Sequence, residues 1–298
     1  MMIYPECIPC ILGVRIKEMI SSGRRDRGIA LELMEYFAEI LRRGIDEGTI
    51  ASSILYNWLI ERVPEVVKYY KKLKLETINH AMDSLPVYEG LLEGLEGYDE
   101  FRMAVKIAAL GNLFDTGVME HEAPEHLSIE DILQKRISLD HTKKLYSLVR
   151  NGGLTIMYLL DNASEAVLDT VLMDLLRRYG NKVIAVAKEE PGFQNDLTID
   201  DAIYAGIDRV ADELISTGSN SSSIFLDKVS EEFMDRLKQS DLIIAKGMAH
   251  FEYISSVKNK IPVKAISFIL VPKCRPVAVA AGGAKGTIVV RMSRGGIL

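Results

Sequence analysis

The chain has few cysteines: three among 298 residues, Cys7, Cys10 and Cys274. An odd number does not form a complete disulfide framework. The C-x-x-C spacing of Cys7 and Cys10 is that of a zinc site, but a closed tetrahedral site needs four ligands, and only Cys274 and a distant histidine could complete it. Reduced, partly buried thiols are the alternative. The role of the three cysteines stays open.

Long apolar runs and an excess of positive charge are also missing. No apolar run reaches the roughly 18 residues that span a bilayer, and the first residues, MMIYPECIPC, lack a positively charged lead into an apolar stretch. Acidic residues outnumber basic ones, 42 against 36, which gives a formal net charge of -6 and disfavours a phosphate-backbone binder. We therefore expect a cytoplasmic protein without a membrane or nucleic-acid partner. The oligomeric state does not follow from these features.

The first half of the sequence is helical in character. Apolar residues recur every three or four positions in 11–20 and 30–41, interleaved with charged residues, and convincing strand runs are absent. Pro64, Pro86 and Pro124 mark breaks between helices. This pattern predicts a helical bundle or cap domain over residues 1–150.

After Asn151-Gly152-Gly153 the pattern changes to short apolar runs separated by amphipathic segments. The runs cover residues 154–160, 182–188, 241–246, 263–270 and 286–291. Strands that alternate with helices predict an α/β fold, here a Rossmann-like three-layer α/β/α domain over 151–298 with a largely parallel sheet. In such sheets, ligands bind at the carboxyl ends of the strands.

Two successive strand ends carry an acid beside an amide. Asp161-Asn162 follows the first run, and Asn195-Asp196 follows the second after a Pro-Gly turn. Carboxylate and amide oxygens suit Mg²⁺ or Mn²⁺, so Asp161, Asn162 and Asp196 are candidate metal ligands. The alternative is helix capping, with Glu165 in a favourable first turn.

Two further strand ends carry cations. Lys246-Gly247 follows the third run, where a glycine lets backbone N–H groups approach an anion and a lysine adds a point charge. Lys273 and Arg275 follow the fourth run, which favours a site for a metal and a phosphate together. Solvated surface cations are the alternative.

One polar segment of the helical half also stands out. Asn112 and Asp115 interrupt the otherwise apolar stretch LGNLFDTGVM. They indicate either a loop that faces the strand ends or a polar turn between two helices.

Seven segments together resemble the metal-dependent damage-control phosphatases, long catalogued as domain-of-unknown-function family eighty-nine. In chain order they are ECIPC, GNLFDTG, DNASE, KEEPGFQNDLTIDDA, STGSNSSS, DLIIAKG and FILVPKC. The resemblance implies an N-terminal helical part packed on a three-layer α/β/α domain. It also implies metal-dependent hydrolysis of small phosphate monoesters, either sugar phosphates or damaged phosphometabolites, with Mg, Mn, Co or Ni as the divalent cation.

The resemblance also implies roles for individual residues. Asp161, Asn162 and Asp196 would hold the cation. Asp161, Glu165 and Lys273 would form the catalytic set, with Glu165 beside the metal site and Lys273 on the substrate phosphate. Asn112 and Asp115 would line the substrate cavity, and Lys246 and Gly247, the anion contacts expected from the third strand end, would also bind the substrate. The C-x-x-C is similar to that of the family's microbial branch. The chain departs from the family at Met248, Ala249 and His250, where Gln-Gly-Asn is frequent, so the substrate stays open.

The expected mechanism is metal-assisted hydrolysis without a covalent phosphoenzyme, in which the cation polarises a phosphoryl oxygen and Lys273 neutralises developing charge. Attack by Asp161 itself is the alternative, but Ala163 stands where aspartyl-phosphate enzymes carry a second Asp. From another class, the chain could be a non-catalytic α/β module that binds a phosphorylated or nucleotide ligand. A metal-linked methyltransferase is less favoured, and no glycine-rich dinucleotide loop follows the first strand.

Overall fold

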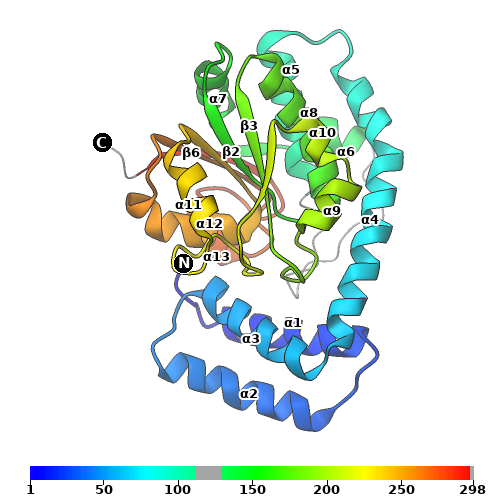
Figure 1. Cartoon of the computed structure of the whole chain (residues 1–298), viewed down its shortest axis with the longest axis vertical. Helices are drawn as coiled ribbons and strands as arrows, with labels where there is room; N and C mark the ends of the chain where they lie inside the picture. The colour runs from blue at the N-terminus through cyan, green and yellow to red at the C-terminus, as the bar shows by residue number, and fades with distance from the viewer. Residues whose placement is uncertain (112–128, 296–298) are drawn as a thin grey trace.

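A seven-stranded sheet forms the centre of the computed structural model, which describes residues 1–111 and 129–295 (Figure 1). The strand order is β1-β7-β6-β5-β2-β3-β4. All neighbours are parallel except β6 and β7. The strands are β1 (Ile137–Asp140), β2 (Thr155–Leu159), β3 (Lys182–Ala187), β4 (Glu213–Ser216), β5 (Leu242–Lys246), β6 (Ala265–Leu270) and β7 (Ile288–Arg294).

Helices cover both faces of the sheet, because successive strand residues point to opposite sides. Ile156 and Tyr158 of β2 face a core shared with α4, α5, α7 and α8, whereas Met157 and Leu159 face a core shared with α11, α12 and α13. The helices are α1 (Cys7–Ser21), α2 (Arg27–Arg42), α3 (Gly48–Arg62), α4 (Glu65–Glu89), α5 (Gly97–Leu110), α6 (Ile129–Gln134), α7 (Thr142–Val149), α8 (Ala163–Arg178), α9 (Ile199–Tyr204), α10 (Ile207–Val210), α11 (Glu231–Lys238), α12 (Gly247–Val257) and α13 (Arg275–Ala281), with 3-10 turns η1 (Gly90–Leu92) and η3 (Lys258–Lys260). The predicted fold class, a mostly parallel α/β sheet with an N-terminal helical part, is confirmed.

The helical part lies at one end of the molecule. Helices α1, α2 and α3 group together there, and α4 runs from them along the side of the α/β part (Figure 1). Val66 and Tyr70, near the start of α4, belong to a core with α3, whereas Ile78 and Ala81 belong to the core that packs on the sheet. Helix α4 therefore passes from the core of the helical part to the core that packs on the sheet. A domain boundary at residue 150 stays a prediction.

Two strands were not expected from the sequence. Strand β1 lies in the half that was expected to lack strands, so that expectation is wrong at residues 137–140. Strand β4 also matches none of the predicted runs. Both are four-residue strands at the two edges of the sheet, and they are mostly half-buried. An edge strand this short needs few apolar residues and leaves a weak pattern.

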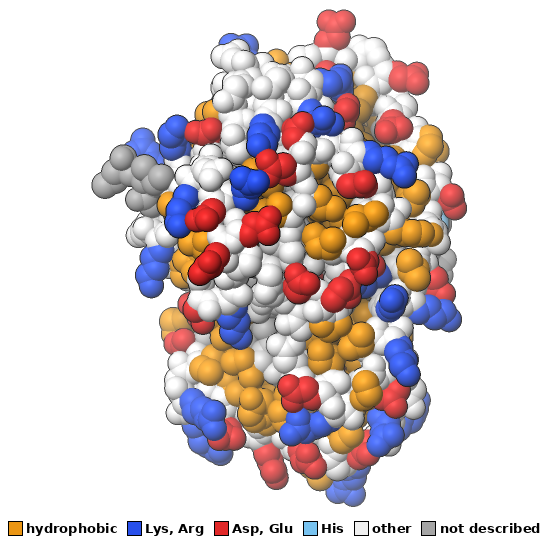
Figure 2. All heavy atoms as spheres, in the orientation of Figure 1, with side chains coloured by type: hydrophobic (Ala, Val, Ile, Leu, Met, Phe, Trp, Pro, Cys, Tyr) orange, Lys and Arg blue, Asp and Glu red, His pale blue; other side chains and the backbone are white. Residues whose placement is uncertain are grey.

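The outer surface fits the composition. Acidic and basic side chains are interspersed over the face seen in Figure 2. No helix within the two described ranges is long and apolar enough to cross a membrane.

Candidate metal and substrate site

The loops that follow β2 and β3 fold onto each other. The Leu197 amide donates to the Asp161 carbonyl oxygen at 2.8 Å, and Asn162 pairs with Asp196 in an isolated antiparallel bridge. Because β2 and β3 are parallel neighbours, their carboxyl ends meet at the same edge. The structure thus brings the three predicted metal ligands together.

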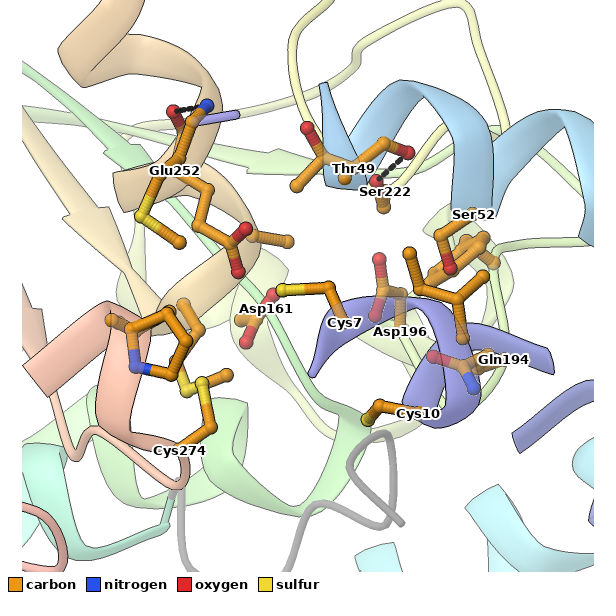
Figure 3. A pocket seen from close by; sticks show the side chains of 18 of the residues that line it. Cys7, Cys10, Thr49, Ser52, Asp161, Gln194, Asp196, Ser222, Glu252 and Cys274 are labelled. Atoms are coloured by element: carbon orange, nitrogen blue, oxygen red, sulfur yellow. Dashed lines mark hydrogen bonds between the residues drawn. The ribbon is translucent and has the colours of Figure 1, made fainter. Parts of the chain in front are cut away.

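A cavity of about 310 Å³ opens at this edge. Asp161, Asn162 and Asp196 line it together with side chains of the helical part and of α12 and α13. In Figure 3, the side chains of Asp161, Asp196, Cys7 and Glu252 converge on the cavity. Residues more than 240 positions apart in the sequence therefore share one pocket wall.

Helix capping does not explain the acid and amide at these strand ends. Asn162 is the N-cap residue of α8, but its side chain makes no capping hydrogen bond. Helix α9 has its own capping box, formed by Thr198 and Asp201, so Asp196 lies outside that cap. Glu165 does lie in the first turn of α8, as expected.

The orientation of Asn162 is set by two carboxylates. Its Nδ2 group donates to Asp161 Oδ2 and to Glu165 Oε2, both at 3.2 Å. The amide nitrogen is thereby occupied, which leaves Oδ1 as the atom that could bind a cation. Glu165 is fully buried and acts here by holding Asn162.

Gly247 allows the close approach of α12 to Asp161. Its φ is +73°, and a Cβ atom built on it would lie 1.8 Å from Asp161 Oδ2. A side chain at position 247 and the Asp161 carboxylate cannot occupy their places together. Gly247 itself is not among the cavity-lining residues, and its contact with substrate stays a prediction.

Lys246 lies beneath the cavity in a buried cluster of charges. Its Nζ forms ion pairs with Glu165 Oε1 and, at 2.8 Å, with Asp169 Oδ1, and it donates to the Ala108 carbonyl oxygen at 2.8 Å. Burial raises the pKa of Asp169 to about 7, with Lys246 acting in the opposite direction. These contacts join β5, α5 and α8 below the site. A role of Lys246 in substrate binding stays a prediction.

Lys188 is a buried cation beside the candidate ligands, and it was not among the residues predicted to form the site. It follows β3 directly, is 1% exposed, and its Nζ lies 3.9 Å from Asp196 Oδ2. Burial lowers the pKa of Lys188, while Asp196 and Asp161 raise it. A lysine at the end of an apolar strand, shortly before Asn195-Asp196, was the available sequence signal.

His250 supports Lys188 from α12. Its Nε2 lies 3.3 Å from Lys188 Nζ and 3.2 Å from the Leu160 carbonyl oxygen, and its Nδ1 lies 3.1 Å from Ser223 Oγ. Burial, with Lys188 adding to it, lowers the pKa of His250 well below its usual value. This shift favours the neutral imidazole, which is 1% exposed and does not line the cavity.

Lys273 is buried on the connection between β6 and α13. Its backbone N–H donates to Met248 Sδ at 3.1 Å, and the side chain is 1% exposed. Its neighbours Cys274 and Arg275 line the cavity, whereas Lys273 does not. A contact between Lys273 and a substrate phosphate stays a prediction. Asn112 and Asp115 lie outside the described residues.

The three cysteines meet around the same cavity. Cys7, Cys10 and Cys274 line it as half-buried free thiols. Burial raises the pKa of Cys274 to about 11, and Glu252 and the other two cysteines add to this shift. Over residues 1–111 and 129–295, no group of three or more His, Cys, Asp or Glu side chains is arranged to hold a metal ion. This geometry gives the zinc interpretation no support.

The residues present fit a small oxygen-seeking cation. Asp161 and Asp196 supply two carboxylates and Asn162 a neutral amide oxygen, a set suited to Mg²⁺ or Mn²⁺ and not to soft metals. The glycine at 247 leaves the space that the Asp161 carboxylate needs. One end of the cavity is thus built from hard oxygen donors.

The fold is that of an α/β protein, and its candidate cation ligands lie at the carboxyl edge of the sheet. The chain belongs to the family of the damage-control phosphatase ARMT1-like domain, whose model matches residues 3–289. The resemblance expected from the sequence is confirmed.

Named relatives match over nearly the whole chain. It is 31% identical to a damage-control phosphatase of Archaeoglobus fulgidus over 98% of this chain and 99% of the relative. It is 29% identical to damage-control phosphatase PH1575 of Pyrococcus horikoshii over 97% of each chain. The crystal structure of PH1575, described as a DUF89 family protein, superposes with a TM-score of 0.80 at 26% identity, over 97% of this chain and 98% of that one.

Proposed function

We propose that the protein is a metal-dependent phosphatase that hydrolyses phosphate monoesters of small metabolites, either sugar phosphates or damaged phosphometabolites. The observation that carries the proposal is the junction of the loops after β2 and β3, which sets Asp161, Asn162 and Asp196 at one end of a cavity of about 310 Å³. A cavity of this size suits a small metabolite. The names of the relatives support the same activity.

The proposed mechanism assigns each residue a task. When bound, a divalent cation, for which Mg, Mn, Co and Ni are the candidates, supplies a Lewis acid for the phosphoryl group. Asp161 and Asp196 hold that cation through their carboxylates, with Asn162 as the neutral ligand. Glu165 keeps Asn162 oriented through its 3.2 Å hydrogen bond.

Cationic side chains complete the mechanism. Lys188 offsets the negative charge of the ligand set from 3.9 Å. Lys273 neutralises the charge that develops on the phosphoryl oxygens, as the family resemblance implies. Hydrolysis proceeds without a covalent phosphoenzyme. Asp161 acts as a ligand and not as the nucleophile, because Ala163 stands where aspartyl-phosphate enzymes carry a second Asp.

The test is hydrolysis of an aryl phosphate by metal-stripped protein titrated with Mg²⁺, Mn²⁺, Co²⁺ and Ni²⁺. We expect activity only with added metal, and a loss of at least about 100-fold in Asp161→Ala and Asp196→Ala. Asp208→Ala, an exposed aspartate on α10, is the matched control and should keep wild-type activity. Folded wild-type protein that turns over nothing with any metal would contradict the proposal and favour a binding module.

A further inference from the structure

We propose that Glu18 of α1 is a positioning residue: through Gln194 it holds the Asp196 loop, residues 188–198, in the conformation that brings Asp196 to Asn162. The contact joins the helical part to a candidate metal ligand across 176 residues of sequence. The inference extends the proposed function, since the cation site it serves rests on that proposal.

The Asp196 loop contains a backbone conformation that needs external support. Gln194 has φ +56°, and in the described part of the chain it is the only residue other than glycine with a positive φ. An L-residue in the left-handed region is unfavourable and persists where its surroundings hold it. Gln194 lies two positions before Asp196 and lines the same cavity. A change of backbone at Gln194 would therefore move Asp196.

Glu18 supplies that support as a buried acceptor. Its Oε1 accepts from Gln194 Nε2 at 2.5 Å, from Arg15 Nη2 at 2.7 Å and from the Tyr70 hydroxyl at 2.8 Å. Arg15, Glu18, Tyr70 and Gln194 are each at most 5% exposed. One oxygen thus fixes three donors that come from α1, α4 and the Asp196 loop.

Two aromatic rings hold the Arg15 guanidinium in place. The Arg15 guanidinium lies over the rings of Tyr56 and Phe193, 5.1 and 5.3 Å from their centroids. Phe193 precedes Gln194 in the loop, and its ring meets Tyr56 edge to face. Arg15 therefore contacts the ring of Phe193, and Glu18 accepts a hydrogen bond from the side-chain amide of Gln194. The ion pair thus holds two consecutive residues of the loop.

A second contact anchors the far end of the loop. Lys74 of α4 pairs with Asp201, which also accepts from the Thr198 backbone N–H at 3.1 Å and from the Thr198 hydroxyl at 2.6 Å. Lys74 is 3% exposed, and the pair joins α4 to the start of α9. The loop thus runs from the end of β3 to an anchored C-terminal end, and the Glu18–Gln194 hydrogen bond holds the part between them.

The test uses variants that change this hydrogen bond with little change of volume. Gln194→Met removes the amide donor, and Glu18→Gln keeps the shape but loses the charge. Glu39→Gln is the matched control, because Glu39 also pairs with an arginine of the helical part but at the surface. Two properties are measured: amide hydrogen exchange at Leu197, whose N–H donates to the Asp161 carbonyl oxygen, and Mn²⁺ affinity of metal-stripped protein by electron paramagnetic resonance.

We expect Gln194→Met to raise exchange at Leu197 and to weaken Mn²⁺ binding by about 10-fold, the lower end for residues that orient metal ligands. Glu18→Gln should shift both in the same direction by less, and Glu39→Gln should shift neither. Unchanged Mn²⁺ affinity in Gln194→Met, with or without faster exchange, would overturn the positioning role. Wild-type protein that binds no Mn²⁺ would instead refute the proposed cation site. In that case amide exchange alone would test whether the loop depends on Glu18. Unchanged exchange at Leu197 in Gln194→Met would overturn that dependence.

Discussion

Gly247→Ala is expected to disable the site while the fold survives. The added Cβ would lie 1.8 Å from Asp161 Oδ2 and 2.4 Å from its Cγ. An ordinary contact is at least 3.4 Å, so the carboxylate must move by about 1.6 Å, the difference between the two distances. Asp161 would then leave the position in which it lines the cavity together with Asp196.

The expected effect on activity is large. A displacement of about 1 Å in a catalytic constellation can cost about 100-fold, and a disturbed ligand shell costs about 10–100-fold in metal affinity. Alanine at φ +73° adds about 1 kcal/mol of backbone strain. We therefore expect kcat/KM for an aryl phosphate to fall at least about 100-fold, with a small loss in the free energy of unfolding measured in urea.

Gly206→Ala separates the clash from the strain. Gly206 has φ +75°, but no atom lies within 4 Å of the position of its Cβ. This control should lose about 1 kcal/mol of stability and keep full activity and Mn²⁺ binding. If Gly247→Ala matched the control in all three measurements, the reasoning that Asp161 acts from its observed position would be refuted.

Three further predictions concern the buried groups beneath and beside the cavity. Lys246→Met leaves Glu165 and Asp169 buried without a cation, so the free energy of unfolding in urea should fall by about 3–5 kcal/mol. A loss below about 1 kcal/mol would contradict the role of Lys246 in this ion cluster. Burial raises the pKa of Asp169 to about 7 from an ordinary value of 3.8. Protonation of Asp169 therefore stabilises the folded state fully below about pH 4. This contribution to the free energy of unfolding is lost as the pH rises to about 7, by up to about 1.4 kcal/mol per pH unit. Asp169→Asn should therefore flatten the fall in unfolding free energy between about pH 5 and 7, and a slope equal to that of wild type would show that Asp169 is ionised throughout. His250→Phe removes the imidazole beside Lys188, so the free energy of unfolding in the same urea assay should fall by about 1–3 kcal/mol. This substitution should lower kcat more than it raises KM, whereas a rise in KM alone would indicate substrate contact.

The sequence was sufficient to predict that the three candidate ligands lie close together, because their placement follows from topology. Asp161 and Asp196 each follow a strand of a predicted parallel sheet, and neighbouring parallel strands end at the same edge. Only the adjacency of the two strands had to be assumed. The roles of the three ligands remain proposals until a metal is measured.

The place of Lys246 was harder to predict, although the strand pattern contains part of the answer. Leu242 and Ile244 of β5 face the core beneath α5 and α8, and the alternation of a strand puts Lys246 on that same face. Its partners, Glu165 and Asp169, lie on a helix whose packing the pattern does not fix. The burial of the lysine therefore required the tertiary structure.

No sequence pattern predicts the Glu18–Gln194 contact. Glu18 is one of several acids spaced along a helix, and a glutamine in the left-handed region matches no turn rule. The same holds for the three cysteines, which meet only because α1 and the residues at the start of α13 line the same cavity. Long-range contacts of single polar side chains carry no periodicity from which to predict them.

The most direct test of the central claim is a crystal of the protein soaked in Mn²⁺ and measured at a wavelength where manganese scatters anomalously. The proposal predicts one strong anomalous peak about 2.0–2.4 Å from carboxylate oxygens of Asp161 and Asp196 and from Asn162 Oδ1. No peak at these three residues, or a peak at Cys7, Cys10 and Cys274 instead, would contradict it.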